Sequence, residues 1–304
     1  MSTSLRIGTR GSKLAMWQAH FVERQLRQAH PDLTIEIVEI QTSGDVIQDR
    51  PLVAIGGQGA FTKELQKALQ EERIDVAVHS LKDLPTFAVE NLCLGAVPPR
   101  GPVGDALVSK KHASFADLPE GAIVATSSLR RRAQIQHRRP DLQMVDIRGN
   151  VDTRLRKLVE QDLDAIILAE AGLVRLDKAE EIREILDPSW LLPAVGQGAL
   201  GLECRADDDG TLSRLSALND DRTKHCALAE RAMLRGLGGG CEVPIGAASD
   251  VNDGQLRLRG VVIAADGSKR IDKEISGSLE QGESLGQQLA EMLLQDGAEA
   301  LLDT

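Results

Sequence analysis

The stretch IDVAVHSLKDLP, residues 74–85, decides the fold class, because a buried strand runs there directly into a polar loop. Ile74–Val78 is a largely apolar run, as expected for a strand covered on both faces. A helix pattern with Leu65 and Leu69 at helical spacing precedes it, and Pro85 ends the regular structure. A helix, a buried strand and a polar loop in this order are typical of the βα units of a mostly parallel sheet.

Further strand-to-loop junctions repeat this plan along the chain. The predicted strands are Leu5–Ile7, Ile123–Thr126, Met144–Ile147 and Asp164–Leu168. Segments 98–104 and 193–198 are rich in glycine and proline, so we expect them to cross between two α/β lobes. After about residue 221 the pattern changes to a helix, a glycine run, short strands near Ile245, Leu256 and Val261, and a helix over Leu285–Leu294. The sequence therefore predicts α/β lobes followed by a separate small α/β domain.

Composition and charge exclude several classes of protein. The 304 residues contain no run of about 18 uninterrupted apolar residues, and the N-terminus lacks the pattern of a secretory signal. We therefore expect a cytoplasmic protein with no membrane partner. The net charge of -10 argues against a nucleic-acid partner. The four cysteines lie far apart, with no histidine at metal-ligand spacing, so we expect reduced thiols and no metal site.

Arginines gather at the predicted strand ends. Arg130 and Arg131 fall in the first turn of a predicted helix, where the helix dipole disfavours each cation by about 0.3 to 1 kcal/mol. Guanidinium groups match carboxylates in bidentate geometry. Comparable positions hold Arg10, Arg148, Arg154 and Arg175. The pattern predicts a ligand with several carboxylates or phosphates, and the lack of a Walker-type loop disfavours a nucleotide. For any single arginine, the alternative is a solvated side chain or one paired with the abundant acids of the chain.

Two single residues carry possible chemistry. Asp83 follows a predicted strand, and a carboxylate there can act as an acid, a base or a partner of a developing cation. Cys241 follows four glycines within five residues, so we expect an accessible thiol that can attach a group covalently. An ordinary loop aspartate and an incidental free cysteine are the alternatives. His79 is expected to be a packed histidine, and Cys93 and Cys204 are expected in the core.

The chain resembles the porphobilinogen deaminase family, also called hydroxymethylbilane synthases, along nearly its whole length. The motifs are TRGSKLAMWQA (9–19), DVAVHSLKDLPT (75–86), ATSSLRRRAQ (125–134), IRGNVDTRL (147–155), DAIILAEAGLVRL (164–176), LPAVGQGALGLECR (192–205) and AERAMLRGLGGGCEVPIG (229–246). The resemblance implies an α/β fold with two periplasmic-binding-protein-like lobes of mostly parallel sheets and a small C-terminal α/β domain. The implied domains are 1–98 with 199–217, then 104–193, then 221–304.

The same resemblance implies a transferase of porphyrin (haem) biosynthesis. It would condense four porphobilinogen molecules head to tail, with release of ammonia, into the linear tetrapyrrole hydroxymethylbilane, and it would act as a monomer. A dipyrromethane cofactor would be bound to Cys241 through a thioether, and Asp83 would be the catalytic residue that contacts the pyrrole NH groups. Cofactor binding would further involve Lys82, Ser128, Arg130 and Arg131, and substrate binding would involve Arg10, Ser12, Arg148, Arg154 and Arg175.

Two loops depart from the family pattern. Many members carry lysines in the glycine loop where this chain has Ala54 and Gln58, and segment 101–104 lacks the usual charged residues. Both departures bear on chain movement and lobe closure. The competing function is a non-catalytic two-lobed carboxylate-binding protein, which would leave Cys241 unexplained. A phosphate-ester enzyme is disfavoured by the missing phosphate loop.

Overall fold

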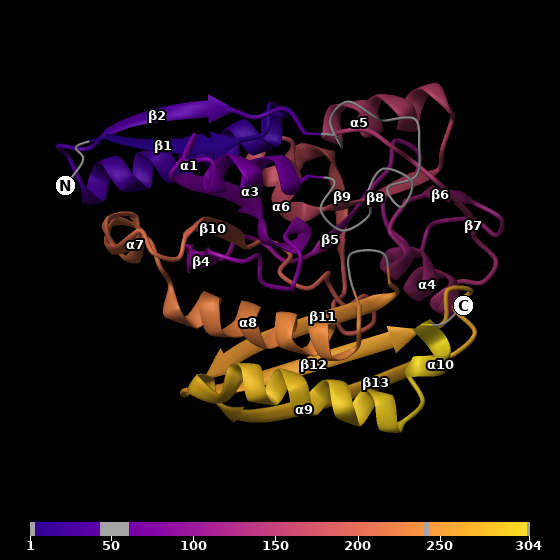
Figure 1. Cartoon of the computed structure of the whole chain (residues 1–304). Coiled ribbons are helices and arrows are strands. Elements are labelled where there is room, and N and C mark those ends of the chain that lie inside the picture. Colours follow the sequence, from indigo (N-terminus) through magenta and orange to yellow (C-terminus); the bar gives the residue numbers. More distant parts are fainter. Residues whose placement is uncertain (1–3, 43–60, 240–242, 303–304) are drawn as a thin grey trace. The chain divides into compact units, whose positions relative to one another are not determined.

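The computed structural model describes residues 4–42, 61–239 and 243–302 (Figure 1). The chain divides into two compact units, Met1–Gly101 with Gly198–Lys224 and Pro102–Gln197 with His225–Thr304. Within the described residues, no helix is both long and apolar enough to cross a lipid bilayer. The three domain boundaries expected from the sequence stay a prediction.

The first unit contains a five-stranded sheet in the order β2-β1-β3-β10-β4. Its strands are β1 (Ser4–Thr9), β2 (Thr34–Glu39), β3 (Val76–Ser80), β4 (Leu92–Ala96) and β10 (Leu200–Arg205). β1 is parallel to β2 and β3, whereas β10 is antiparallel to both β3 and β4. The sheet is therefore mostly parallel, as predicted, with β10 as its reversed strand.

Helices bury both faces of this sheet. They are α1 (Lys13–Ala29), α3 (Lys63–Gln70) and α7 (Asp209–Ser216). Val76 and Val78 of β3 share a core with residues of α1, whereas Ala77 shares a second core with Leu65 and Leu69 of α3. Successive side chains of a strand point to opposite faces, so the two cores lie on the two sides of the sheet. This confirms the doubly covered strand, although it spans Val76–Ser80 and not 74–78 as expected.

The second unit contains a sheet of similar plan, in the order β7-β6-β8-β5-β9. The strands are β5 (Asp105–Val108), β6 (Ile123–Ala125), β7 (Gln143–Val145), β8 (Ala165–Ala169) and β9 (Ile182–Leu186). β6 is parallel to β7 and β8, and β5 is the reversed strand between β8 and β9. The helices that follow the parallel strands are α4 (Leu129–Arg138), α5 (Val151–Glu160) and α6 (Glu170–Arg175).

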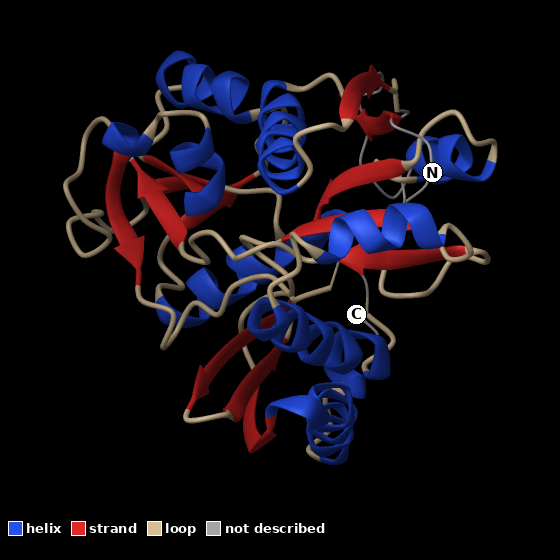
Figure 2. Cartoon of the chain, turned by 90° about the vertical axis from the view of Figure 1, so that its left-hand side faces the viewer, coloured by secondary structure: helices blue, strands red, loops and turns tan. Residues whose placement is uncertain are grey.

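The same unit contains a small antiparallel sheet of β11 (Ile245–Asn252), β12 (Gln255–Ile263) and β13 (Arg270–Ser278). Figure 2 shows helices on one face of this sheet. They are α8 (Asp221–Gly236) and α9 (Gly282–Gln295), and the short α10 (Glu299–Leu302) ends the described chain. Met233 of α8, Leu258 of β12 and Leu289 of α9 pack in one core.

The small sheet corrects one detail of the sequence analysis. Leu256 and Val261 lie on one strand, β12, and the third strand is β13, which was not predicted. Its sequence RIDKEISGS contains only Ile271 and Ile275 as large apolar residues, so its alternation is weak. The fold class, α/β with two mostly parallel sheets and a small C-terminal α/β part, is confirmed.

Candidate active site

In the first unit, the predicted site residues gather at one edge of the sheet. Arg10 and Ser12 follow β1, and Lys82 and Asp83 follow β3. β1 and β3 are parallel neighbours, so their carboxyl ends meet at the same edge, where α/β sheets bind ligands. Gln18 of α1 donates a hydrogen bond from Nε2 to Ser80 Oγ at 2.7 Å, which joins the two segments.

The local contacts at this edge orient these side chains. Ser12 caps α1, and its Oγ accepts from the backbone N–H of Ala15 at 3.3 Å. The guanidinium carbon of Arg10 lies 4.0 Å from the ring centroid of Phe61. Asp83 ends the 3-10 turn η2 (Leu81–Asp83) and is half-buried. Its carboxylate makes no hydrogen bond or ion pair with the described residues, so both oxygens are available to a ligand.

A buried polar network supports the end of β3. His79 Nε2 lies 3.0 Å from Glu203 Oε2, and Gln66 Nε2 donates to Glu203 Oε1 at 3.0 Å. All three residues are at most 8% exposed. His79 is thus a packed histidine, as predicted. Gln66 and Glu203 were missed, because their roles depend on α3 and β10 meeting β3, which no local pattern indicates.

In the second unit, three parallel strands end at one edge. Ser128 follows β6, Arg148 follows β7, and both lead into helices, α4 and α5. Ser127 Oγ donates to Ile147 O at 2.8 Å and accepts from Ile147 N at 3.1 Å, so the loops after β6 and β7 are joined. Ser128 Oγ caps α4 by accepting from Arg131 N. The predicted residues of this unit are therefore brought to adjacent loops.

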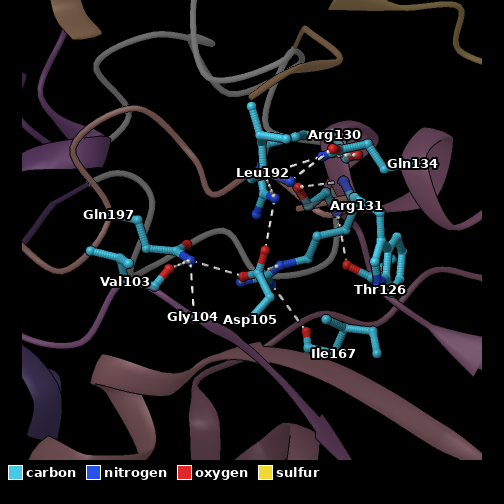
Figure 3. A network of polar contacts seen from close by, with 12 residues as sticks. Val103, Gly104, Asp105, Thr126, Arg130, Arg131, Gln134, Ile167, Leu192 and Gln197 are labelled. Atoms are coloured by element: carbon cyan, nitrogen blue, oxygen red, sulfur yellow. Dashed lines mark hydrogen bonds and ion pairs between the residues drawn. The ribbon is translucent and has the colours of Figure 1, made fainter. Parts of the chain in front are cut away.

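Arg130 and Arg131 are buried and share one carboxylate, that of Asp105 (Figure 3). Arg130 Nη1 lies 2.7 Å from Asp105 Oδ2, and Arg131 Nη2 lies 2.7 Å from Asp105 Oδ1. Gln197 Nε2 donates to the same Oδ1 at 2.9 Å and to Val103 O at 2.8 Å. The sequence predicted an anion near the arginines in the first turn of α4, and the carboxylate of Asp105 is one such anion.

This cluster keeps a surplus of positive charge. Burial alone would raise the pKa of Asp105, but Arg130 and Arg131 outweigh burial and hold that pKa well below its usual range. Burial lowers the pKa of Arg130. Two guanidinium groups face one carboxylate, so one positive charge remains. Arg130 Nε is a buried donor without a hydrogen-bond acceptor in the described part of the chain, so a ligand carboxylate would satisfy both its charge and its hydrogen bonding.

The sequence did not single out Asp105 or Gln197. Asp105 opens β5 directly after segment 101–104, and its place beside α4 follows only from the strand order of the sheet. Gln197 lies in the segment that was expected to be a crossing. The available sequence signal for Asp105 was its position directly before the apolar run Ala106–Val108. A carboxylate there is buried together with the strand, and a buried carboxylate requires cationic partners.

The remaining arginines lie at the same edge with different environments. Arg154, in the first turn of α5, donates from Nε to Gly149 O at 2.8 Å. Arg148 is half-buried between β7 and α5. Arg175 ends α6 and is half-buried, and burial lowers the pKa of its guanidinium. Cationic side chains in partly dehydrated positions suit carboxylates of a ligand.

Several sequence predictions lie outside the described residues. These are Cys241, in the segment between α8 and β11, and Ala54 and Gln58 of the first loop departure, whereas the second departure, segment 101–104, is described. The other thiols are described. Cys204 is fully buried in the core of the first unit and Cys93 packs against that core, so their predicted core positions are confirmed.

The fold and these clusters define a class: an α/β protein with two mostly parallel sheets, arginine-rich strand ends and a small antiparallel sheet covered by helices. Two family descriptions match the sequence, "Porphobilinogen deaminase, dipyromethane cofactor binding domain" over residues 5–213 and "Porphobilinogen deaminase, C-terminal domain" over residues 224–295. The chain belongs to the porphobilinogen deaminase family. The recognition made from the motifs is confirmed, and with it the enzyme class and the dipyrromethane cofactor.

Individual relatives agree with this assignment. The chain is 50% identical over 301 residues to a porphobilinogen deaminase of Syntrophotalea carbinolica, covering 99% of this chain and 96% of that protein. It is 48% identical over 299 residues to one of Pelobacter propionicus, covering 98% of this chain and 96% of that protein.

Among solved structures the chain is similar to the methionine-binding protein MetQ, with a TM-score of 0.47, 13% identity and coverage of 75% of this chain and 95% of that one. A periplasmic substrate-binding protein of Coxiella burnetii gives a TM-score of 0.45, 14% identity and coverage of 75% and 96%.

Proposed function

We propose that this chain condenses four porphobilinogen molecules head to tail, with release of ammonia, into hydroxymethylbilane, and that the residues at the two sheet edges carry this reaction. The observation that supports these roles is the gathering of arginines at the carboxyl ends of parallel strands, with a buried surplus of positive charge beside Asp105. Porphobilinogen carries two carboxylates, so such edges suit the substrate and its oligomers. A non-catalytic carboxylate receptor is not favoured by the family assignment.

The residues present fit a dipyrromethane. This group carries four carboxylates. One of them could pair with the surplus positive charge of the Arg130 and Arg131 cluster and accept a hydrogen bond from the unpaired Nε of Arg130. Lys82, Ser128, Arg130 and Arg131 would hold the cofactor, and Cys241 would bind it covalently through its sulfur. When bound, dipyrromethane supplies the free pyrrole carbon from which the chain of substrate units grows.

Asp83 is the proposed catalytic residue. Loss of ammonia from porphobilinogen leaves a cation on the substrate, and the unpaired, half-buried carboxylate of Asp83 would stabilise it. At about 4 Å and an effective dielectric constant near 20, the attraction is about 4 kcal/mol before desolvation is subtracted. That is equivalent to nearly a thousandfold in rate, because each 1.36 kcal/mol is about tenfold.

The remaining site residues would bind substrate and growing chain. Arg10, Ser12, Arg148, Arg154 and Arg175 would pair with acetate and propionate side chains. Arg10 is oriented by Phe61 and Arg154 by Gly149 O, so both guanidinium groups lose less freedom on binding.

We extend the proposal to the setting of the enzyme. It would act in the cytoplasm as a monomer without a nucleic-acid partner, and the net charge of -10 supports the last point. The three domains would be residues 1–98 with 199–217, 104–193 and 221–304. The position of β10 in the sheet of the first unit supports the return of the chain to the first domain.

The test compares Asp83→Asn with Asp83→Glu. The amide keeps the shape but cannot offset a cation, so Asp83→Asn should lose most turnover. Asp83→Glu keeps the charge but displaces it by about 1 Å, and a misplacement on that scale can cost about a hundredfold in rate. Ammonia release and the mass of protein-bound adducts are measured after porphobilinogen is added. Turnover of Asp83→Asn at the wild-type rate would remove Asp83 from the mechanism.

A further inference from the structure

Two cysteines of the first unit face each other across neighbouring strands. Cys93 of β4 and Cys204 of β10 are register partners in the antiparallel pair, and their Sγ atoms lie 3.9 Å apart. Cys204 is fully buried, whereas Cys93 is half-buried. The strand order places β4 at the end of the sheet, beside β10. Cys93 is therefore partly accessible to solvent, and Cys204 lies beside it in the core.

The register of the two strands is compatible with a disulfide between Cys93 and Cys204. A disulfide requires Cα atoms about 4.4 to 6.8 Å apart. Residues directly opposite in an antiparallel pair have Cα atoms about 4.5 or 5.5 Å apart, depending on their hydrogen bonding. The sulfur atoms must close from 3.9 Å to about 2.05 Å, which side-chain rotation can supply.

The packing around the pair leaves room for the sulfur atoms. Gly95 lies two residues after Cys93 and is the extra residue of β4 where the register with β10 shifts, since Leu94 pairs with Glu203 and Ala96 with Leu202. A Cβ at Gly95 would lie 2.9 Å from Cys204 Sγ and 2.9 Å from Leu215 Cδ1 of α7. A side chain at position 95 would force Cys204 Sγ, Leu215 Cδ1 or both to shift, so the glycine is compatible with the close approach of the two thiols.

We propose that Cys93 and Cys204 form a modification site that a hydroperoxide oxidises to a disulfide. In the first step, Cys93 Sγ attacks the O–O bond of hydrogen peroxide, which yields a sulfenic acid on Cys93 and one water. In the second step, Cys204 Sγ attacks the sulfur of Cys93. The S–S bond forms, the S–O bond breaks, and the Cys204 proton leaves with the hydroxyl group as a second water.

The environments of the two thiols set this order. Cys93 is the half-buried thiol of the pair, and burial raises the pKa of Cys204, so Cys204 is the less reactive of the two thiols toward an oxidant. Cys226, in α8, is also buried but belongs to a different core, that of the small sheet. It therefore provides a matched control for a buried thiol outside the pair.

The disulfide would tie β4 to β10 without moving the residues at the sheet edge. Because it closes a long loop of the unfolded chain, it should raise the midpoint of thermal unfolding. Activity should be unchanged, since neither cysteine is among the proposed site residues and the backbone need not shift.

The experiment treats the cofactor-loaded enzyme with hydrogen peroxide and records its intact mass. The remaining thiols are then blocked by alkylation, and cross-linked peptides are identified. Wild type and Cys226→Ser should lose about 2 Da and yield a peptide pair containing Cys93 and Cys204, and dithiothreitol should reverse both changes. Cys204→Ser should instead gain about 16 Da or more on Cys93. Absence of the 2 Da loss in wild type, or its persistence in Cys93→Ser or Cys204→Ser, would overturn the proposal.

Discussion

Replacing Asp105 by Asn tests the buried charge cluster of the second unit. The carboxylate is 1% exposed and lies 2.7 Å from a guanidinium nitrogen of Arg130 and of Arg131. Asparagine has nearly the same volume, so no cavity forms. The change removes the negative charge and leaves two buried cations facing an amide.

The structure sets the magnitude of the loss. Breaking a buried ion pair by removing one partner costs about 3 to 5 kcal/mol, because a buried charge is left uncompensated. The matched control is Asp146→Asn. Asp146 accepts a hydrogen bond at 2.8 Å from Arg132, which lies in the same turn of α4 as Arg130 and Arg131. The side chain of Asp146, however, is 74% exposed. An exposed pair contributes about 0 to 1 kcal/mol, so the control should lose little stability.

The assay is the free energy of unfolding in urea at several pH values. The pKa of Asp105 is depressed in the folded state, so its contribution is complete above the unfolded value of about 3.9 and is lost as the pH falls through the folded pKa. The difference between wild type and Asp105→Asn should be constant from pH 7 to about pH 5 and shrink below about pH 4. A loss no larger than that of Asp146→Asn at pH 7 would refute the reasoning.

Four further substitutions, each with a matched control, test the other parts of the site. Glu203→Gln should lower the free energy of unfolding in urea by about 1 to 3 kcal/mol, because it weakens the buried contacts to His79 and Gln66. The control Glu71→Gln changes an exposed carboxylate and should leave this free energy unchanged. Equal unfolding curves for the two variants would contradict the role of the buried network. Arg148→Leu and Arg154→Leu should lower kcat/KM for porphobilinogen with cofactor mass retained, while Arg156→Leu, whose arginine pairs with exposed Glu160 on the same helix, should act as wild type. Cys241→Ser should fold by circular dichroism but lack the covalent cofactor mass that Cys226→Ser retains, and equal cofactor content would sink the attachment site.

Local patterns indicate the strands and the starts of the helices that follow them. Ser12 caps α1 and Ser128 caps α4, and a serine directly before an amphipathic run is a local signal of a helix start. The buried strand was also recognisable from residues 74–78, because a largely apolar run is the local pattern of a strand covered on both faces. These features depend on a few neighbouring residues, which the sequence displays directly.

Partner choice across the fold was not predictable in the same way. The first turn of α4 called for an anion, but only the strand order of the sheet shows that Asp105 is one such anion. Likewise, the support of His79 by Glu203 depends on β10 pairing with β3. Such contacts join residues about 25 to 140 positions apart, and a single sequence carries no local signal for them.

The place of β10 has a consequence for how the protein is made. Its residues, Leu200–Arg205, sit between β3 and β4 in the first sheet, although the whole of the second large sheet, β5 to β9, is encoded before them. At about 5 to 20 residues per second, a ribosome finishes β4 several seconds before it delivers β10. During that interval β3 and β4 lack the strand that joins them, so the nascent first lobe exposes unpaired strand edges that chaperones can bind. The middle lobe, whose strands are contiguous in sequence, can close its sheet first.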